Sequence, residues 1–458
     1  MITRREFCAA SAAPALVASQ KRQKNILFLI GDDLGRTTGA YGDPNAVTPN
    51  MDRMAREGVR FANAFGSTAS CSPSRSVMLS GMHNHSTGQY GLGHADHNFS
   101  YKPAIMPLPR LLKNAGYATG YLGKLHVNPE SVFEWDAAVQ LNPRSVFEMA
   151  GKAKGFIQAA GGKPWYLHVG FTDPHRDFGN KDYPGVTRRK FDAAKIRVPS
   201  FLTDSPGVRA ELAQYYESTH RLDQGIGFMF DVLKETGQLD NTVVVLLGDN
   251  GVPFPNAKTT VYDAGIHLPL IVWSPGQQKR GIVNQGMVSF VDLLPTFVDW
   301  AGARLPEYPV HGRSFLPILE QENPAGWDEV YCSHTFHEVT MYYPMRGIRT
   351  RRYKYIRNLY PELEYPHASD LWASAMWQDV LKNGKRGMVG RRTANQYLHR
   401  PAEELYDVTK DPDEVVNLAG SAAHRGDLEN LRGKVEAWRH QTRDPWNIID
   451  REREMGLK

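Results

Sequence analysis

The sequence of 458 residues predicts an α/β fold, in which a large, mixed but mostly parallel sheet lies between helices and a smaller α+β region follows. Two observations predict the sheet: continuous apolar runs end in polar clusters, and segments with helical periodicity lie between those runs. A third observation is a change near Glu329, after which short strand-like segments follow one another. Ligands of such sheets bind beyond the carboxyl ends of the strands, so we expect the functional site there.

Four apolar runs are the expected strands of the large sheet. Residues 25–30 and 242–247 are apolar on both faces, which is typical of strands buried in the middle of a parallel sheet. Residues 164–171 and 268–273 predict two further strands. Together these runs predict the central layer of the fold.

The helical and C-terminal elements follow from periodicity. Apolar residues recur at helical spacing over 108–114 and 208–236. In the C-terminal region we expect short strands over 343–349, 352–359 and 405–407 and a closing helix over 427–442. These elements predict a small domain with an antiparallel sheet beside the site.

Composition excludes some classes of protein. The hydrophobic fraction of 41% and the charged fraction of 22% are those of a globular protein, and the net charge of +5 is too small to indicate nucleic-acid binding. Beyond the N-terminus, no apolar run approaches the roughly 18 residues that a membrane span needs. We therefore expect no nucleic-acid partner and no membrane span.

The N-terminus predicts export. Arg4 and Arg5 form a twin-arginine pair, and a weakly apolar stretch follows over residues 9–18. A basic, disordered tail is the alternative interpretation. The expected segments are an export signal over 1–19, a catalytic domain over 20–328 and the C-terminal α+β region over 329–458. The mature protein is then expected in a periplasm or outside the cell.

Two acidic pairs predict a metal site. Asp32 and Asp33 follow the run at 25–30, and Asp249 and Asn250 follow the run at 242–247. Carboxylate and amide oxygens suit calcium or magnesium rather than zinc. A single pair could simply cap a helix, but two pairs at equivalent strand ends favour a metal.

A histidine-rich stretch suggests zinc, but its spacing matches no standard zinc pattern. The residues are His83, His85, His94, Asp96 and His97. Histidines in a pocket or on the surface are the favoured interpretation.

The segment Cys71-Ser72-Pro73-Ser74-Arg75 resembles the signature of type I sulfatases, whose cysteine becomes formylglycine. The other matching blocks are Asp32-Asp33, residues 123–126, residues 249–251 with Lys258, residues 404–407 and residues 417–419. This resemblance implies an alkaline-phosphatase-like sandwich fold, a maturing enzyme that generates formylglycine, and one calcium ion, with magnesium as the alternative. It also leaves Cys332 without a partner, because Cys8 would leave with the signal and Cys71 would be oxidised, so we expect no structural disulfide.

A narrower resemblance is to the heparan N-sulfatase (sulfamidase) subfamily. It rests on residues 171–176, 249–255, 337–346 and 444–446. The sequence departs from that subfamily at Lys258, where arginine is usual, and from sulfatases in general at His267, where arginine is common. Both departures weaken the transfer of fine substrate specificity.

The resemblance assigns roles to the site residues. The expected metal ligands are Asp32, Asp33, Cys71, Asp249 and Asn250. The expected catalytic residues are Cys71 as the formylglycine nucleophile, Arg75 to support it, Lys124 and Lys258 to neutralise sulfate, His175 as general acid and His126 as general base. Because hydrated formylglycine carries two hydroxyls, one can attack sulfur while the other allows the release of sulfate.

Five residues are candidates for binding the sugar: His97, Arg176, His337, Glu338 and Arg346. Arginine can bind a carboxylate or sulfate with two hydrogen bonds. The alternative is that Arg346 and Glu338 form an ion pair at a domain interface.

These inferences predict an exported sulfohydrolase that removes the N-linked sulfate from terminal N-sulfoglucosamine of heparan-type glycans. The alternatives are an O-sulfatase on a sugar or aryl sulfate, a related phosphonate or phosphodiester hydrolase, and an inactive glycan-binding homologue. The sequence allows a homodimer without predicting one.

Overall fold

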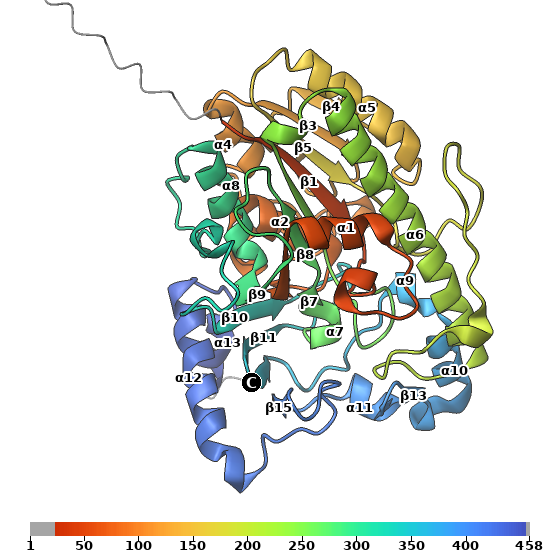
Figure 1. The fold of residues 1–458 in the computed structure, drawn as a ribbon. Helices are drawn as coiled ribbons and strands as arrows, with labels where there is room; N and C mark the ends of the chain where they lie inside the picture. Colours follow the sequence, from red (N-terminus) through yellow and green to blue (C-terminus); the bar gives the residue numbers. More distant parts are fainter. Residues whose placement is uncertain (1–22, 455–458) are drawn as a thin grey trace, which may run out of the picture.

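A nine-stranded sheet forms the centre of the protein (Figure 1). The structure is a computed structural model that describes residues 23–454. Its strands are β1 (Asn25–Gly31), β2 (Val59–Phe65), β3 (Ala118–Gly123), β4 (Ala137–Val139), β5 (Trp165–Gly170), β6 (Thr242–Gly248), β7 (His267–Leu268), β8 (Leu270–Trp273) and β9 (Ile282–Ser289). The order is β4-β3-β5-β1-β6-β8-β2-β7, with β9 also paired to β2. The five strands β4, β3, β5, β1 and β6 run parallel to one another, whereas β8 is antiparallel to both β6 and β2.

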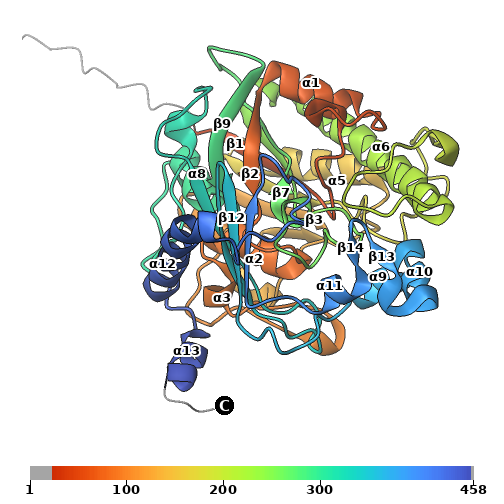
Figure 2. The same cartoon turned by 90° about the horizontal axis from the view of Figure 1, so that it is seen from below.

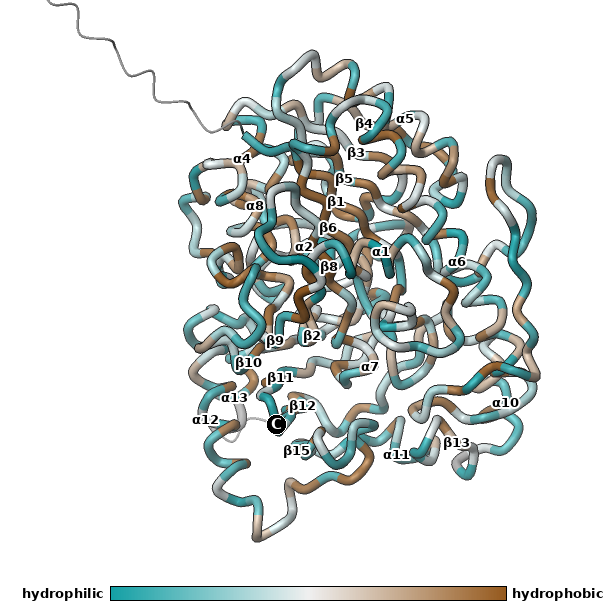
Figure 3. Tube along the Cα trace, viewed as in Figure 1, coloured by the Kyte–Doolittle hydropathy of each residue, from teal (hydrophilic) through white to brown (hydrophobic). Residues whose placement is uncertain are grey.

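Helices cover both faces of this sheet because its central strands are apolar on both faces. Along β1, Ile26 and Phe28 pack toward one helical layer, and Leu27 and Leu29 pack toward the other. The first layer contains α2 (Cys71–Ser80), α4 (Leu108–Asn114) and α8 (Leu293–Ala301), and the second contains α1 (Pro49–Glu57), α5 (Val146–Ala159) and α6 (Pro206–Glu235). Figure 3 shows β1, β5 and β6 as the hydrophobic centre of this sandwich.

A four-stranded antiparallel sheet lies beside the large one (Figure 2). Its strands are β10 (Glu329–His334), β11 (Met345–Thr350), β12 (Tyr353–Asn358) and β15 (Glu403–Asp407). One face packs against α12 (Arg425–Gln441), and the other joins a core shared with β2 and with the segment that carries α10 and α11. The remaining elements are α3 (Asn84–Thr87), α7 (Asp263–Ile266), α9 (Ser369–Trp372), α10 (Ala375–Asn383), β13 (Met388–Val389), β14 (Arg392–Thr393), α11 (Ala394–Leu398) and α13 (Asn447–Glu454).

The predicted fold class is confirmed, and most of the predicted elements are present. The run at 268–273 differs, because Pro269 separates β7 from β8 and has no N–H to donate to a sheet. Strand β10 was not among the predicted strands. The boundary at residue 329 stays a prediction, and so does the export signal, which lies outside the described residues. No helix within residues 23–454 is long and apolar enough to cross a membrane.

Candidate active site

The two acidic pairs meet because β1 and β6 are adjacent and parallel. Gly31 pairs with Gly248 at the ends of these strands, so the residues that follow project from the same edge of the sheet. The backbone N–H of Asp33 donates a hydrogen bond to Asp249 Oδ1 at 2.9 Å. Asp33 has a φ of 63°, a left-handed conformation that is uncommon for residues other than glycine and recurs at functional sites.

The buried donor set fits a hard divalent cation. One carboxylate oxygen from each of Asp32, Asp33 and Asp249, together with Cys71 Sγ, lies within 4.8 Å of the others, and all four residues are buried. Asp32 Oδ1 and Asn250 Oδ1 are buried and have no hydrogen-bond partner. Burial and the neighbouring Asp32 raise the pKa of Asp249 to about 7. Because a cation would relieve this repulsion and occupy the orphaned oxygens, the residues fit calcium or magnesium.

Cys71 begins helix α2, where the backbone dipoles favour negative charge. Its Sγ lies 3.7 Å from Asp33 Oδ1, so this sulfur stands where the oxygens of an aldehyde hydrate would be. Burial raises the pKa of the thiol well above its ordinary value. An unconverted Cys71 would therefore be a poor thiolate nucleophile, which agrees with a role that depends on oxidation.

Arg75, one turn along α2, contacts the acidic cluster. Its Nε donates to Asp249 Oδ2 at 2.8 Å, Nη1 donates to the carbonyl of Lys124 at 2.7 Å, and Nη2 lies 3.7 Å from Asp32 Oδ1. The guanidinium is fully buried, and Nη2 has no hydrogen-bond partner. That Arg75 supports the nucleophile stays a prediction, because its contacts are to the acidic residues and to the carbonyl of Lys124.

Two lysines place positive charge beside Cys71. Lys258 Nζ lies 3.0 Å from Asp33 Oδ2 and 2.5 Å from Asp370 Oδ2, and Lys124 Nζ forms an ion pair with Asp32. Burial acts against the charged form of each lysine, but the carboxylates outweigh it and raise the pKa of both. Both lysines therefore stay protonated and can neutralise a bound sulfate.

Histidines occupy the other walls. His175 Nε2 lies 3.8 Å from both Asp33 Oδ2 and Asp370 Oδ2. His126, at a φ of 63°, shares a hydrogen bond between its Nε2 and His94 Nδ1. Burial lowers the pKa of His126 well below its ordinary value, with Lys124 adding to the effect, so the ring is neutral and can accept a proton.

These side chains line one cavity of about 380 Å³. Its lining residues are Cys71, Leu92, His94, His97, Lys124, His126, His175, Lys258, His337, Glu338, Ser369 and Asp370. The predicted nucleophile, lysines and histidines therefore share a single space next to the acidic cluster.

Three of the five predicted sugar-binding residues also line this cavity: His97, His337 and Glu338. The buried ring of His337 shares a 2.8 Å hydrogen bond through Nδ1 with Ser70 Oγ, directly before Cys71. Glu338 Oε1 accepts hydrogen bonds from the backbone N–H, at 2.9 Å, and the hydroxyl of Ser369.

The structure places the other two away from the cavity lining. Arg176 forms a two-fold hydrogen-bonded ion pair with Glu211, and its guanidinium lies over Phe254. Arg346 is fully buried and forms a similar pair with Asp444. The pair between Arg346 and Glu338 that was considered as an alternative is not among the contacts, because each side chain has another partner.

No motif or periodicity indicated Ser369 and Asp370, which nevertheless line the cavity. His94 was expected only in general terms, as one of the histidines in a pocket or on the surface, and its proximity to His97 in the chain could have placed it in this cavity.

The histidine-rich stretch divides between two places. His83 and His85 are buried near His311 and Trp438, whereas His94 and His97 lie at the cavity. Within the described residues, the groups of side chains arranged to hold a metal include none of these histidines and not Asp96. The favoured interpretation was histidines in a pocket or on the surface: His94 and His97 lie at a pocket, whereas His83 and His85 are buried rather than exposed.

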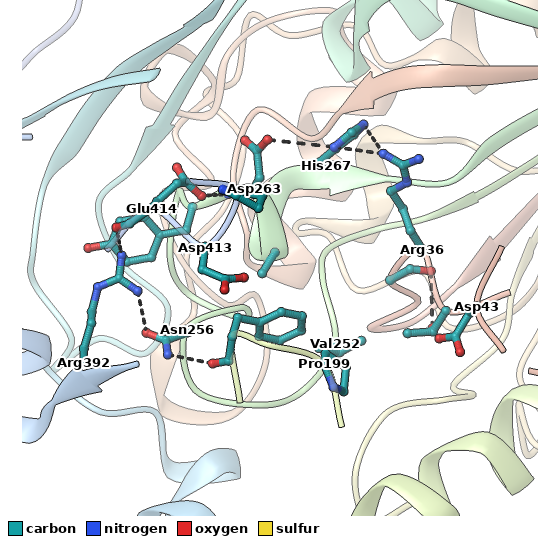
Figure 4. Close-up of a pocket in the computed structure, with 16 residues that line it drawn as sticks. Arg36, Asp43, Pro199, Val252, Asn256, Asp263, His267, Arg392, Asp413 and Glu414 are labelled. Atoms are coloured by element: carbon teal, nitrogen blue, oxygen red, sulfur yellow. Dashed lines mark hydrogen bonds and ion pairs between the residues drawn. The ribbon is translucent and has the colours of Figure 1, made fainter. Parts of the chain in front are cut away.

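His267 lies in a different cavity of about 280 Å³ (Figure 4). Its ring is within 2.6 Å of Arg36 and stacks on Phe65, and Asp263 lies beyond it. Asp263 in turn pairs with Lys354. Lys354 also pairs with Glu414, and Arg391 pairs with Asp413. We assign no role in the reaction to His267.

The fold and the site together define the class of protein. The sulfatase family model matches residues 24–303, and a model described as the C-terminal part of N-sulphoglucosamine sulphohydrolase matches residues 256–373. The chain belongs to the sulfatase family. Its sequence is 37% identical to human N-sulphoglucosamine sulphohydrolase, over 93% of this chain and 91% of that protein. It is 30% identical to an ulvan-active sulfatase of Formosa agariphila, over 90% of this chain and 79% of that protein.

Solved structures share the fold. An enzyme in complex with its substrate D-glucosamine-2-N,6-O-disulfate superimposes with a TM-score of 0.67 at 21% identity, covering 93% of this chain and 99% of the other. A phosphonate monoester hydrolase of Agrobacterium radiobacter superimposes with a TM-score of 0.69 at 18% identity, covering 92% and 96%. At such identities the likeness shows the architecture alone.

Proposed function

We propose that the protein is a metal-dependent sulfohydrolase that removes the N-linked sulfate from terminal N-sulfoglucosamine of heparan-type glycans. The observation that carries this proposal is the cavity in which Cys71, Lys124 and Lys258 lie together beside the acidic cluster. The similarity to human N-sulphoglucosamine sulphohydrolase supports the choice of a nitrogen-linked sulfate.

The active protein would contain a bound divalent metal and a formylglycine made from Cys71. Asp32, Asp33, Asp249 and Asn250 would hold a divalent metal, and calcium suits their oxygen donors. With formylglycine made from Cys71, this metal would supply an activated hydroxyl for attack on sulfur. Magnesium fits the same donors.

The residues of the chain bind the sulfate and move the protons. Lys124 and Lys258 would neutralise the sulfate oxygens, whose charge shifts as the sulfur–nitrogen bond breaks. His175 would donate a proton to the leaving nitrogen. Burial and Lys258 lower its pKa, but a bound sulfate would favour the protonated ring. His126, neutral because it is buried, would accept the proton that is lost when sulfate is released.

The size of the cavity suits one sugar. A volume of about 380 Å³ is near the lower end of the range for small-ligand pockets. We therefore propose action on the terminal residue of a glycan rather than on an internal one.

The test compares substrates of the matured, calcium-loaded protein. Sulfate release is measured from N-sulfoglucosamine, 6-O-sulfoglucosamine and an aryl sulfate. We expect the highest kcat/KM on N-sulfoglucosamine. No release from that sugar together with release from an O-sulfate would overturn the proposal in favour of an O-sulfatase. Retained glycan binding with an unconverted Cys71 thiol would favour the inactive homologue.

A further inference from the structure

Asp370 is a carboxylate in the wall of the cavity, and the mechanism above gives it no role. It lies in the short helix α9, far in sequence from every other group of the reaction. One oxygen, Oδ2, is 2.5 Å from Lys258 Nζ and 3.8 Å from His175 Nε2. The other, Oδ1, is buried and has no hydrogen-bond donor, and His337 Nε2 is 4.0 Å away.

Asp370 Oδ1, a buried acceptor without a donor, raises the free energy of the folded protein unless a ligand supplies a hydrogen bond to it. A buried polar atom without a partner costs about 1–3 kcal/mol, and more when it is charged. Glu338, the neighbouring carboxylate in the wall, differs because Ser369 already donates two hydrogen bonds to its Oε1. Asp370 Oδ1 therefore lacks the donor that Glu338 Oε1 has, and a donor on the substrate could supply it.

The charge of Asp370 limits which part of the substrate it can contact. Its carboxylate would repel the oxygens of a bound sulfate, which the two lysines attract. Lys258 Nζ lies between Asp33, at the acidic cluster, and Asp370, in the wall of the cavity. A sulfate held by Lys258 and Lys124 next to Cys71 would thus turn its leaving group toward the wall that carries Asp370.

An N-linked and an O-linked leaving group differ in what they offer to that oxygen. A sulfamate nitrogen carries an N–H, and it must gain a proton as the S–N bond breaks and the bonding electron pair moves to nitrogen. The sulfuryl group passes to the attacking oxygen, and the nitrogen departs as an amine. The nitrogen keeps its N–H and gains a second one as it leaves, so it can donate a hydrogen bond throughout, whereas the bridging oxygen of a sulfate ester presents only lone pairs.

We propose that Asp370 binds the leaving nitrogen through Oδ1 and so determines the preference of the site for nitrogen-linked over oxygen-linked sulfate. The inference rests on the proposed function, since it assigns a residue to the choice between the two linkages. Asp370 acts here as an acceptor and transfers no proton itself.

Asp370→Asn tests the assignment, because it keeps the shape and removes the negative charge. We expect kcat/KM on N-sulfoglucosamine to fall about 100-fold, comparable to the loss of one preorganised hydrogen bond in an active site. Hydrolysis of an aryl sulfate, which has no nitrogen at the scissile bond, should stay within about three-fold of the wild type. Asp379→Asn, at a half-exposed position on α10, is the matched control and should change neither activity.

A parallel loss on both substrates would overturn the inference, because it would mean that Asp370 acts only by holding Lys258. A loss on N-sulfoglucosamine and 6-O-sulfoglucosamine alike, with the aryl sulfate unaffected, would also overturn it and assign Asp370 to a sugar hydroxyl. Unchanged activity of Asp370→Asn on N-sulfoglucosamine would also overturn the inference.

A binding measurement separates this inference from the proposed function. D-Glucosamine, the product with a free amine, is titrated calorimetrically into the matured, calcium-loaded wild type and into Asp370→Asn, with 2-deoxyglucose, which has no donor at this position, as the reference ligand. We expect the variant to bind glucosamine about 10-fold more weakly and 2-deoxyglucose equally well. Equal affinity for glucosamine would overturn the inference. A wild type inactive on N-sulfoglucosamine would overturn the proposed function, while the titration would still decide the role of Asp370.

Discussion

Arg75 Nε donates a hydrogen bond to Asp249 Oδ2 at 2.8 Å, and both side chains are fully buried. This contact ties helix α2, which carries Cys71, to the carboxyl end of β6. The same guanidinium reaches the backbone of Lys124 after β3. Arg75 therefore links three elements of the fold that each supply a residue to the site.

Replacement of Arg75 should damage both stability and activity. Arg75→Met leaves Asp249 buried without its cation, and breaking a buried pair in this way costs about 3–5 kcal/mol. Urea unfolding of the metal-free protein measures this loss. Arg75→Lys keeps the charge but cannot donate in several directions, so we expect it to unfold at an intermediate urea concentration. Equal stability of all three proteins would contradict the linking role.

Conversion of Cys71 should be necessary for activity. Cys71→Ala removes the precursor of the aldehyde, so sulfate release should fall to background while thermal unfolding stays cooperative. Mass spectrometry of the peptide that contains residue 71 should show the aldehyde in active wild-type protein. Cys332→Ala is the control, since Cys332 is buried in β10 and lies outside the cavity lining. Full activity of Cys71→Ala would refute the proposed nucleophile.

Calcium affinity should depend on pH through Asp249. Its pKa in the metal-free protein is raised to about 7 by burial and by Asp32, and a ligand carboxylate must lose its proton to bind metal. Below pH 7 the apparent affinity should therefore fall by up to about ten-fold per pH unit, and binding should release a proton. Calorimetric titration with calcium at pH 5.5, 6.5 and 7.5, in buffers of different ionisation enthalpy, measures both effects.

The same pKa has a consequence for the metal-free fold. The folded pKa of Asp249 lies above its ordinary value of 3.8. The folded state therefore binds more protons than the unfolded state between these values, and this contribution to stability is present at low pH and is lost as the pH rises through 7. With chelator present, this residue should make the protein more stable near pH 5 than near pH 8. With saturating calcium the dependence should disappear or reverse, since the metal stabilises the ionised form.

The sequence predicted the parts of the site that the geometry of the sheet brings together. Asp32 and Asp249 follow buried parallel strands, so their proximity follows from strand pairing alone. The position of Asp370 depends instead on the path of a segment without periodicity, and no local pattern reveals it. Similarly, the orientation of β8 could not be read from its apolar residues, because strands buried on both faces have the same composition in parallel and antiparallel pairs.

Arg346 is a residue for which the sequence suggested a contact that the structure does not show. Its position in a matching block suggested contact with the sugar, but Asp444, 98 residues away in sequence, satisfies it through two hydrogen bonds at 2.8 and 3.0 Å. Arg439 also donates to Asp444, at 2.9 Å, so the carboxylate joins α12 to the small sheet. Arg346 therefore stabilises the packing of the C-terminal region.

This position leads to a prediction that separates stability from catalysis. Arg346→Met should lower the free energy of unfolding by about 3–5 kcal/mol, because Asp444 loses one of its two buried cations, while kcat/KM per folded molecule stays within about two-fold. Urea unfolding and substrate kinetics at a temperature where the variant is folded measure the two quantities. Adding Asp444→Leu should recover part of the stability, since a buried pair replaced by apolar side chains is often tolerated, although Arg439 then loses a partner. A large rise in KM in Arg346→Met without loss of stability would instead assign Arg346 to the sugar.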